Sequence, residues 1–314
     1  MSNNINRKKV SIITPVFNEQ ENVYRYYRKM RTVIDKASQY DFEFIITDNN
    51  SSDDTYKRFQ MIHEYDKRVK LYKLARNVGY QKSIFVGYSK ATGDCAIEFD
   101  VDLQDPPELL LDFLKHWESG YKVIYGIRKH REEGFFITWI RKIFYRVVSK
   151  ISDTETPVDA GDFMLLDKRI LSELQKMNEQ SPYLRGIIFR MGFRKIGVEY
   201  SRKARKLGST KFSMGKMVSF AIDGITSQSV TPLKLATYFG LVVASSSLLL
   251  SLYFVLGKLL YDTNYPEGFT TTTVLILFSI SLNAIFLGII GEYIGRIFRQ
   301  VKTDPIALIE DSKE

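Results

Sequence analysis

Two aspartates separated by one residue, Asp100 and Asp102, are the side chains of this sequence best placed to do chemistry. An apolar run that begins at Cys95 leads into them, and a proline pair at 106–107 ends the segment. The run predicts a short buried strand, and open α/β sheets bind ligands at the carboxyl ends of their strands. Two carboxylates there suit Mg²⁺, which favours one or two carboxylates together with phosphate oxygens. An isolated Asp-x-Asp is more often a solvated acidic turn, so the surrounding sequence decides between the two interpretations.

The segments around this pair alternate between expected strands and expected helices. Strands are predicted at 9–14, 42–47, 69–74, 95–99 and 121–125. Helices are predicted at 21–37, after Asp53, from about residue 80 to Tyr88, and at 108–118. This alternation is typical of an α/β protein with a parallel, doubly wound sheet. Neither G-x-G-x-x-G after the first strand nor G-x-x-x-x-G-K-[ST] is present, so nucleotide binding would use carboxylates, a metal and basic side chains.

Composition sets further limits on the class of protein. The chain has 314 residues and a formal net charge of +9, enough for one large domain or two small ones. The single cysteine, Cys95, excludes a disulfide framework and indicates a reducing compartment. The three histidines are scattered and do not predict a catalytic cluster. The polar, basic residues 1–9 are not followed by the apolar run of a signal peptide.

Two long runs, 236–257 and 268–291, contain no charged residue. Each is about the length that crosses a hydrocarbon core of roughly 30 Å, although buried helices of a soluble protein are the alternative. The turn 261–267 lacks Lys and Arg, whereas basic residues flank the runs on both sides. By the positive-inside rule, both flanks are expected in the cytoplasm, with the chain as a multi-pass protein of the inner membrane. The excess positive charge is then expected to attract anionic membrane lipids and not nucleic acid.

Two basic amphipathic segments, about 135–151 and 211–225, are expected to lie in the membrane interface, with core packing as the alternative. The predicted organisation is a cytoplasmic catalytic domain over 1–230, a two-helix membrane region over 231–296, and a cytoplasmic tail over 297–314.

Several motifs taken in order resemble one enzyme family. These are Pro15-Val-Phe-Asn-Glu19, the turn after Asp48, Asp100-Val-Asp-Leu-Gln104 and Gly161-Asp-Phe163, followed by the two apolar runs. The pattern resembles the polyprenyl-phosphate glycosyltransferases, which belong to glycosyltransferase family 2 and have a GT-A catalytic domain. It is more similar to the bacterial undecaprenyl-phosphate (bactoprenol) glucosyltransferases than to dolichol-phosphate mannose synthase. The resemblance extends to Gly291-Glu-Tyr-Ile-Gly-Arg296, and the order and spacing of the motifs make it specific.

The resemblance implies a pocket for a nucleotide sugar. Pro15, Phe17 and Glu19 would line the nucleotide pocket, and Asp48 would accept hydrogen bonds from the base or ribose. Relatives often have Asp-Gly after that position, where this chain has Asn49-Asn50, so the identity of the base stays open.

The resemblance also implies a diphosphate and metal site in the Asp-x-Asp segment. Asp100, Val101, Asp102 and Gln104 would contact the donor there. Asp100 and Asp102, with Gln104 beside them, would hold Mg²⁺ or Mn²⁺, which neutralises a leaving nucleoside diphosphate.

Basic residues would complete the phosphate sites. Arg128 and Arg131 follow the last predicted strand and are assigned to the acceptor phosphate. Arg205-Lys-Leu-Gly-Ser-Thr-Lys211 resembles the family's Arg-x-x-Gly-x-Ser-Lys loop, with Thr210 in place of Ser, so Arg205 and Lys211 are assigned to the donor. Arg presents a planar fork to phosphate oxygens and Lys a point charge. Simple attraction to the membrane surface is the alternative role for this positive charge.

Asp162 is the residue that the resemblance implies as the catalytic base, with Asp159 as the second choice. A phosphate monoester has a second pKa near 6, so the acceptor is largely dianionic at neutral pH and is already a nucleophile. Asp162 is therefore expected to position the acceptor or a basic neighbour, although a structural role in the turn is also open.

The resulting expectation is an inverting glycosyltransferase that moves glucose from UDP-glucose to undecaprenyl phosphate, for later modification of lipopolysaccharide or another envelope glycan. UDP-N-acetylhexosamine and GDP-mannose are alternative donors, and relatives suggest a homo-oligomer such as a tetramer. A processive polysaccharide synthase is disfavoured because the sequence has no Gln-x-x-Arg-Trp motif. A non-catalytic nucleotide-sugar sensor is a further alternative, which the intact aspartate pair argues against.

Overall fold

The computed structural model describes residues 7–128, 160–177, 179, 182–202, 268–301 and 305–314, and short pieces between 238 and 249. The chain divides into two units, which are considered separately. The first comprises Met1–Arg146, Thr154–Met214 and Thr303–Glu314, and the second Val147–Asp153 and Gly215–Lys302. The expected interfacial segments 135–151 and 211–225 lie outside the described residues.

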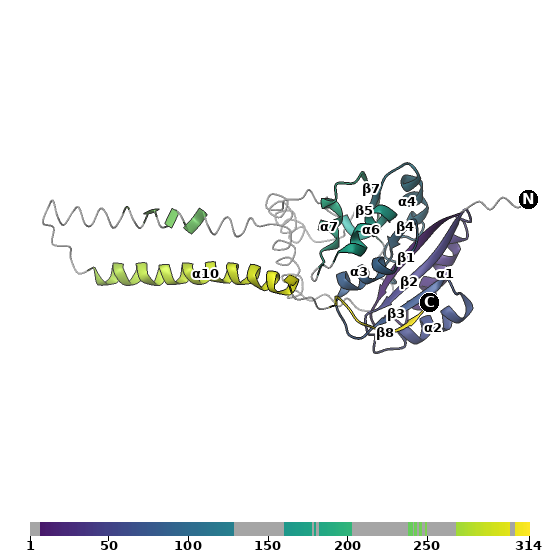
Figure 1. Ribbon diagram of the computed structural model, residues 1–314, viewed down its shortest axis with the longest axis horizontal. Helices are drawn as coiled ribbons and strands as arrows, with labels where there is room; N and C mark the ends of the chain where they lie inside the picture. The colour runs from purple at the N-terminus through teal and green to yellow at the C-terminus, as the bar shows by residue number, and fades with distance from the viewer. Residues whose placement is uncertain are drawn as a thin grey trace, which may run out of the picture. The chain divides into compact units, whose positions relative to one another are not determined.

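The first unit is built on a sheet of eight strands within the described residues, in the order β7-β5-β6-β4-β1-β2-β3-β8 (Figure 1). The strands are β1 (Lys8–Val16), β2 (Tyr40–Asp48), β3 (Val69–Leu74), β4 (Cys95–Glu98), β5 (Val123–Arg128), β6 (Ala160–Asp167), β7 (Lys195–Tyr200) and β8 (Ile309–Lys313). The sequence predicts that Pro15 ends the first strand, but β1 continues to Val16 because Pro15 still pairs in register with Thr47.

The sheet is mixed, which corrects the expectation of a parallel one. The central strands β4, β1, β2 and β3 are parallel, as predicted. β6 runs antiparallel to both β4 and β5, and β8 runs antiparallel to β3. Alternating strands and helices predict parallel neighbours, but β6 and β8 stand outside that alternation. An apolar run such as Phe163–Leu166 predicts a buried strand and carries no information about its direction.

Helices cover both faces of the sheet, as a doubly wound architecture requires. On one face lie α1 (Val23–Ile34), α2 (Thr55–Tyr65) and α4 (Leu109–Glu118), packed on strand residues such as Ile12 and Phe44. On the other lie α3 (Tyr80–Lys90), α6 (Lys168–Lys176) and α7 (Leu184–Arg190), packed on residues such as Ile13 and Ile45. Because consecutive strand residues alternate between faces, β1 and β2 supply both cores and read as continuous apolar runs.

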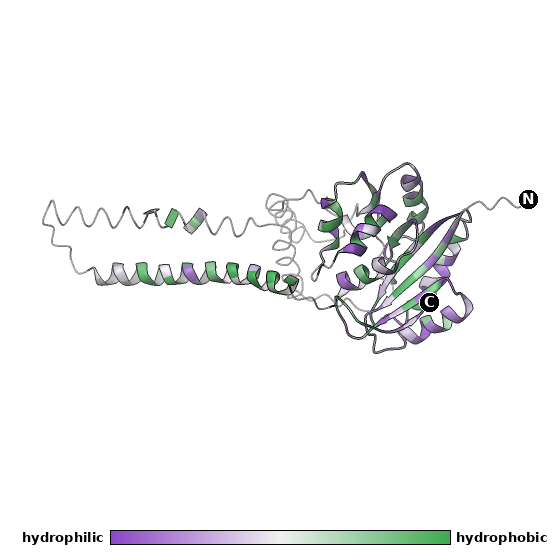
Figure 2. Cartoon of the chain, in the orientation of Figure 1, coloured by the Kyte–Doolittle hydropathy of each residue, from purple (hydrophilic) through white to green (hydrophobic). Residues whose placement is uncertain are grey.

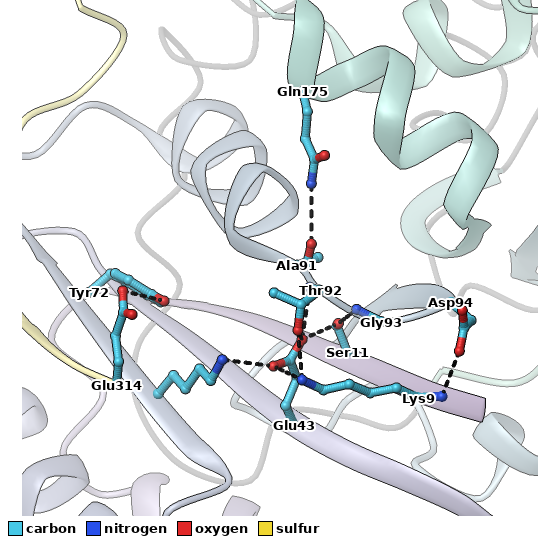
Figure 3. A network of polar contacts seen from close by, with 11 residues as sticks. Lys9, Ser11, Glu43, Tyr72, Ala91, Thr92, Gly93, Asp94, Gln175 and Glu314 are labelled. Atoms are coloured by element: carbon cyan, nitrogen blue, oxygen red, sulfur yellow. Dashed lines mark hydrogen bonds and ion pairs between the residues drawn. The ribbon is translucent and has the colours of Figure 1, made fainter. Parts of the chain in front are cut away.

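A buried carboxylate, Glu43 of β2, holds together the end of the sheet opposite to the Asp-x-Asp segment (Figure 3). It accepts hydrogen bonds from Ser11 Oγ at 2.6 Å and from the backbone and hydroxyl of Thr92 at 2.9 and 2.8 Å. Lys9 Nζ and Lys70 Nζ lie 2.7 and 3.1 Å from its Oε2. Burial alone would raise the pKa of Glu43, but the hydrogen bonds from Lys9, Ser11 and Thr92 outweigh it and lower the pKa to about 2.

We expect Glu43→Gln to lower the free energy of unfolding at pH 7 by about 3 kcal/mol, the equivalent of the pKa shift. A depressed carboxylate pKa stabilises the fold above its ordinary value of 4.5, and that stability is lost as the pH falls toward 2. The difference from the wild type should therefore shrink in urea denaturation at pH 3. Glu118→Gln is the control, because its ion pair with Lys8 is exposed and worth at most about 1 kcal/mol.

The second unit contains α10 (Phe269–Val301), a helix of 33 residues. Its residues are mainly apolar (Figure 2). Leu287 and Phe298 are more than half exposed. Within the described part of the chain, no helix combines the length and apolar character needed to cross a membrane. Most of the first predicted span, 236–257, lies outside the described residues, and the second, 268–291, falls on α10, for which that finding holds.

Candidate active site

Those predicted donor residues that the structure describes gather at one edge of the sheet, because three neighbouring parallel strands end there. β4, β1 and β2 lie side by side, and their carboxyl ends lead into Asp100, the segment 15–19 and Asp48. The antiparallel pairing of β6 with β4 brings the start of β6, and with it Asp162, to the same edge. The fold thus brings together residues that are up to 147 positions apart in sequence, from Pro15 to Asp162.

Asp100 is the centre of this group, with its side chain 23 % exposed. The hydroxyl of Tyr80, the first residue of α3, donates to Asp100 Oδ1 at 2.9 Å and lies 3.3 Å from Glu98 Oε1. Arg202 Nη2 lies 3.4 Å from Asp100 Oδ2, and Arg202 Nε lies 3.2 Å from Asp105 Oδ1. One guanidinium therefore joins the first aspartate of the Asp-x-Asp pair to Asp105, which follows the pair.

Negative charge is concentrated around Asp100. Its pKa is raised to about 7, first by burial and then by the charges of Asp105 and Asp102, although Arg202 and the Tyr80 hydroxyl act in the opposite direction. Glu98 is buried, and its pKa is raised well above the ordinary value by burial and then by Asp100 and Asp105. A bound cation would favour the ionised form of these carboxylates, because its positive charge offsets the repulsion between them.

Asp102 lies on the tight turn that follows. Its Oδ1 accepts a hydrogen bond from the backbone N–H of Gln104 at 3.0 Å, and Leu103 between them has a φ of 58°. Val101 and Leu103 are buried, so the turn is fixed by the core while Asp102 and Gln104 stay partly exposed.

The oxygen-only donor set of this turn suits a hard divalent cation that completes its shell with diphosphate oxygens. In the described part of the chain, no three or more His, Cys, Asp or Glu side chains group as a metal site of their own. The assignment of the metal to Asp100 and Asp102, with Gln104 beside them, stays a prediction.

Asp48 ends β2 and is almost completely buried. Ser51 fixes its carboxylate, since the Ser51 hydroxyl donates to Oδ1 at 2.5 Å and the Ser51 N–H to Oδ2 at 3.0 Å. Burial raises the pKa of Asp48, while the Ser51 bonds and the charge of Lys73 lower it. The following Asn49 donates to Asn77 Oδ1 at 2.9 Å and accepts from the Val78 N–H at 2.8 Å, which ties this loop to the start of α3.

The segment 15–19 forms the neighbouring loop. Pro15 is buried in β1, whereas Phe17 and Glu19 are partly exposed. Glu19 accepts a hydrogen bond from Asn22 Nδ2 at 2.8 Å, and its N–H donates to Thr55 Oγ1 at 2.8 Å. The loops after β1 and β2 therefore support each other.

Asp162 is held by two side chains that the sequence did not predict. Gln81 Nε2 donates to Asp162 Oδ2 at 2.9 Å, and Arg185 Nε lies 3.4 Å from Oδ1. Gln81 Oε1 in turn accepts from the N–H of Leu184 at 3.2 Å, which links α3 to the start of α7. Asp162 and Arg185 are both only 15 % exposed, so their pairing occurs largely away from solvent.

Arg128, at the end of β5, is connected to the same cluster through Tyr200. Arg128 Nε donates to the Tyr200 hydroxyl at 3.2 Å, and that hydroxyl donates to Asp105 Oδ1 at 2.5 Å. The predicted residues Arg131, Arg205 and Lys211, and the alternative base Asp159, lie outside the described residues.

Comparison with known proteins identifies the family. Residues 11–175, which contain the loops after β1, β2 and β4 and also Asp162, match the family model described as glycosyl transferase family 2. The chain belongs to glycosyltransferase family 2. It is a glycosyltransferase with a GT-A-like α/β fold, as the motifs predicted, but its sheet is mixed and not parallel.

Relatives match over nearly the whole chain. The chain is 35 % identical over 303 residues to the uncharacterized glycosyltransferase YkcC of Bacillus subtilis (strain 168), covering 96 % of this chain and 93 % of the relative. It is 32 % identical over 307 residues to the prophage bactoprenol glucosyl transferase homolog of Escherichia coli (strain K12), covering 98 % and 100 %. A solved structure, the mannosyltransferase PcManGT from Pyrobaculum calidifontis in complex with GDP-Man and Mn²⁺, is similar at a TM-score of 0.44 and 16 % identity, covering 90 % and 87 %.

Proposed function

We propose that this glycosyltransferase moves a hexose, glucose from UDP-glucose, to undecaprenyl phosphate at a membrane surface, with inversion at the anomeric carbon. The observation that carries the proposal is the Asp100 cluster, in which a partly buried carboxylate is joined to Arg202 at the carboxyl end of β4. Asp162 lies at the same edge of the sheet. Relatives named for bactoprenol and glucose, at 32 % identity over nearly the full chain, support the choice of acceptor and sugar.

The chemistry follows from the charges at this edge of the sheet. A phosphate oxygen of the acceptor attacks the anomeric carbon, the bond from that carbon to the diphosphate breaks, and UDP leaves with its electron pair. A bound Mg²⁺ or Mn²⁺, held by Asp100 and Asp102 with Gln104 beside them, would neutralise charge on the leaving diphosphate. Arg202 and Arg128 add fixed positive charge near the reacting phosphates, where guanidinium groups bind oxygen pairs well.

The nucleoside end of the donor is assigned to the loops after β1 and β2. Asp48, held in place by Ser51, would accept hydrogen bonds from the base or ribose. Pro15, Phe17 and Glu19 would line the neighbouring wall, and Arg205 and Lys211 would reach the diphosphate. Arg131 would join Arg128 at the acceptor phosphate.

A donor screen tests the proposal. The purified full-length chain should transfer radiolabelled glucose from UDP-glucose to undecaprenyl phosphate in vesicles when Mg²⁺ or Mn²⁺ is present, and excess chelator should abolish transfer. UDP-N-acetylhexosamine and GDP-mannose are tested in parallel. Faster transfer from one of those would replace the sugar and keep the reaction class. Tight binding of nucleotide sugar without any transfer would instead favour a sensor.

A further inference from the structure

The last residues of the chain form an edge strand beside the predicted nucleoside pocket. β8 pairs antiparallel with β3, and its register places Lys73 opposite Asp311, Tyr72 opposite Ser312 and Leu71 opposite Lys313. The backbone N–H of Ala75 continues the pairing by donating to Leu308 O at 2.9 Å. These contacts belong to the segment predicted as a tail, and they extend the sheet on the side where β2 ends in Asp48.

The register aligns alternating charges across three strands. Lys73 of β3 pairs with Asp48 of β2 on one side and with Asp311 of β8 on the other. Residues directly opposite each other on neighbouring strands point to the same face of the sheet. A carboxylate, an ammonium group and a second carboxylate therefore follow one another from the predicted pocket to the sheet edge.

Side-chain contacts fix the outer part of this row. Asp311 Oδ2 accepts a hydrogen bond from the Tyr56 hydroxyl at 2.8 Å, and Glu310 Oε2 lies 2.8 Å from Lys73 Nζ. The Lys73 ammonium also lies 5.9 Å from the centre of the Tyr56 ring. Tyr56 is the second residue of α2, which begins directly after the loop that carries Asp48 and Ser51.

We propose that β8 is a positioning element of the donor site, whose carboxylates hold Lys73 and Tyr56 so that Asp48 keeps its place and its free lone pairs for the nucleoside. This inference rests on the nucleoside role of Asp48 in the proposed function. Lys73 has acidic neighbours on both sides, and β8 supplies those on the outer side, Glu310 and Asp311. Without their charge, the ammonium would be drawn toward Asp48, and an ion pair there would compete with the base or ribose for the same oxygens.

The opposite face of β8 supplies a matched control. Glu314 Oε1 accepts a hydrogen bond from the Tyr72 hydroxyl at 3.1 Å (Figure 3). Tyr72 alternates with Lys73 along β3 and packs in the core beneath α3, where Lys90 Nζ lies 5.3 Å from its ring centre. Glu314 therefore helps to hold β8 on the sheet from the face that does not carry Asp48.

The experiment compares the double variant Glu310→Gln/Asp311→Asn with Glu314→Gln, both in the full-length chain. Calorimetric titration with UDP and with GDP, each with Mn²⁺, gives the affinity for the nucleotide. We expect the double variant to bind about tenfold more weakly, or about 1.4 kcal/mol, and Glu314→Gln to stay within about twofold of the wild type. Equal losses in both variants would show that β8 acts only as a structural edge and would overturn the inference.

Hydrogen exchange of the ligand-free protein tests the role of β8 separately from the proposed function. Binding of UDP or GDP by the wild type tests the proposed function, whereas the contrast between the two variants tests the role of β8. Amides in the loop 48–55 should exchange faster in the double variant than in Glu314→Gln, because only the former releases Lys73 and Tyr56. The same exchange rates in both variants would overturn the inference, whichever nucleotide the wild type binds.

Discussion

Asp100→Asn is expected to lower kcat/KM for sugar transfer by at least about 10²-fold, because an amide binds a hard divalent cation more weakly than a carboxylate. The substitution keeps the size of the side chain, and its oxygen can still accept the hydrogen bond from Tyr80. It removes the negative charge that faces Arg202 at 3.4 Å. The loss should therefore fall on catalysis and on metal-dependent donor binding, with the fold intact.

Two measurements separate this outcome from simple destabilisation. Thermal unfolding of Asp100→Asn should match the wild type or lie slightly above it, since the substitution removes one of several crowded carboxylates. Asp112→Asn on α4 is the control, because that carboxylate is exposed and pairs only with Lys115 three residues on in the described contacts. Transfer by Asp100→Asn at more than a tenth of the wild-type rate would rule out the metal role assigned to it.

The central strands and their helices could be predicted because their signals are local. The strand 69–74 has the predicted bounds, and the helix predicted at 108–118 is observed as Leu109–Glu118. β8 could not be predicted, since Ile309-Glu-Asp-Ser-Lys313 is mostly charged and polar. It becomes a strand because it pairs with β3 and because tyrosine hydroxyls bind the carboxylates of this segment. Tyr56 binds Asp311 from 255 residues away in sequence, and Tyr72 binds Glu314 from 242 residues away.

The same distinction applies to the candidate site. Asp48, Asp100, Asp102 and Asp162 could be predicted as site residues because each lies in a recognisable short motif. Tyr80, Gln81, Arg185 and Arg202 were missed because no local pattern marks them. Their contacts with Asp100 and Asp162 span 20 to 102 residues and exist only once α3, α7 and the end of β7 are in place. The one signal in the sequence was Gly79, which ends the loop 75–79 and marks the start of the helix that carries Tyr80 and Gln81. In the structure Gly79 has a φ of 91° and directly precedes α3.

Asp162→Asn is expected to lower the transfer rate by about 10²-fold or more at every pH, as a positioning role predicts and a general-base role does not. The carboxylate accepts from Gln81 Nε2 at 2.9 Å and pairs with Arg185 at 3.4 Å, so donor groups face both of its oxygens. An asparagine would turn its own NH₂ group toward one of those donors. The pair would separate, and Arg185 would lose the carboxylate that fixes its position.

The pH dependence of the defect decides between the two roles. If Asp162 removes a proton from a monoanionic acceptor phosphate, its role should become unnecessary at high pH, where the phosphate has already lost that proton. The dianion rises from about 10 % at pH 5 to about 99 % at pH 8 for a second pKa near 6, so the ratio of wild-type to variant rates would fall about tenfold. We expect that ratio to stay constant across this range, with Gln81→Ala showing a smaller defect of the same pH-independent kind. Use of the ratio removes other titrations that both proteins share, including that of Asp100. A tenfold recovery of Asp162→Asn at high pH, with unchanged donor affinity, would instead make Asp162 the base.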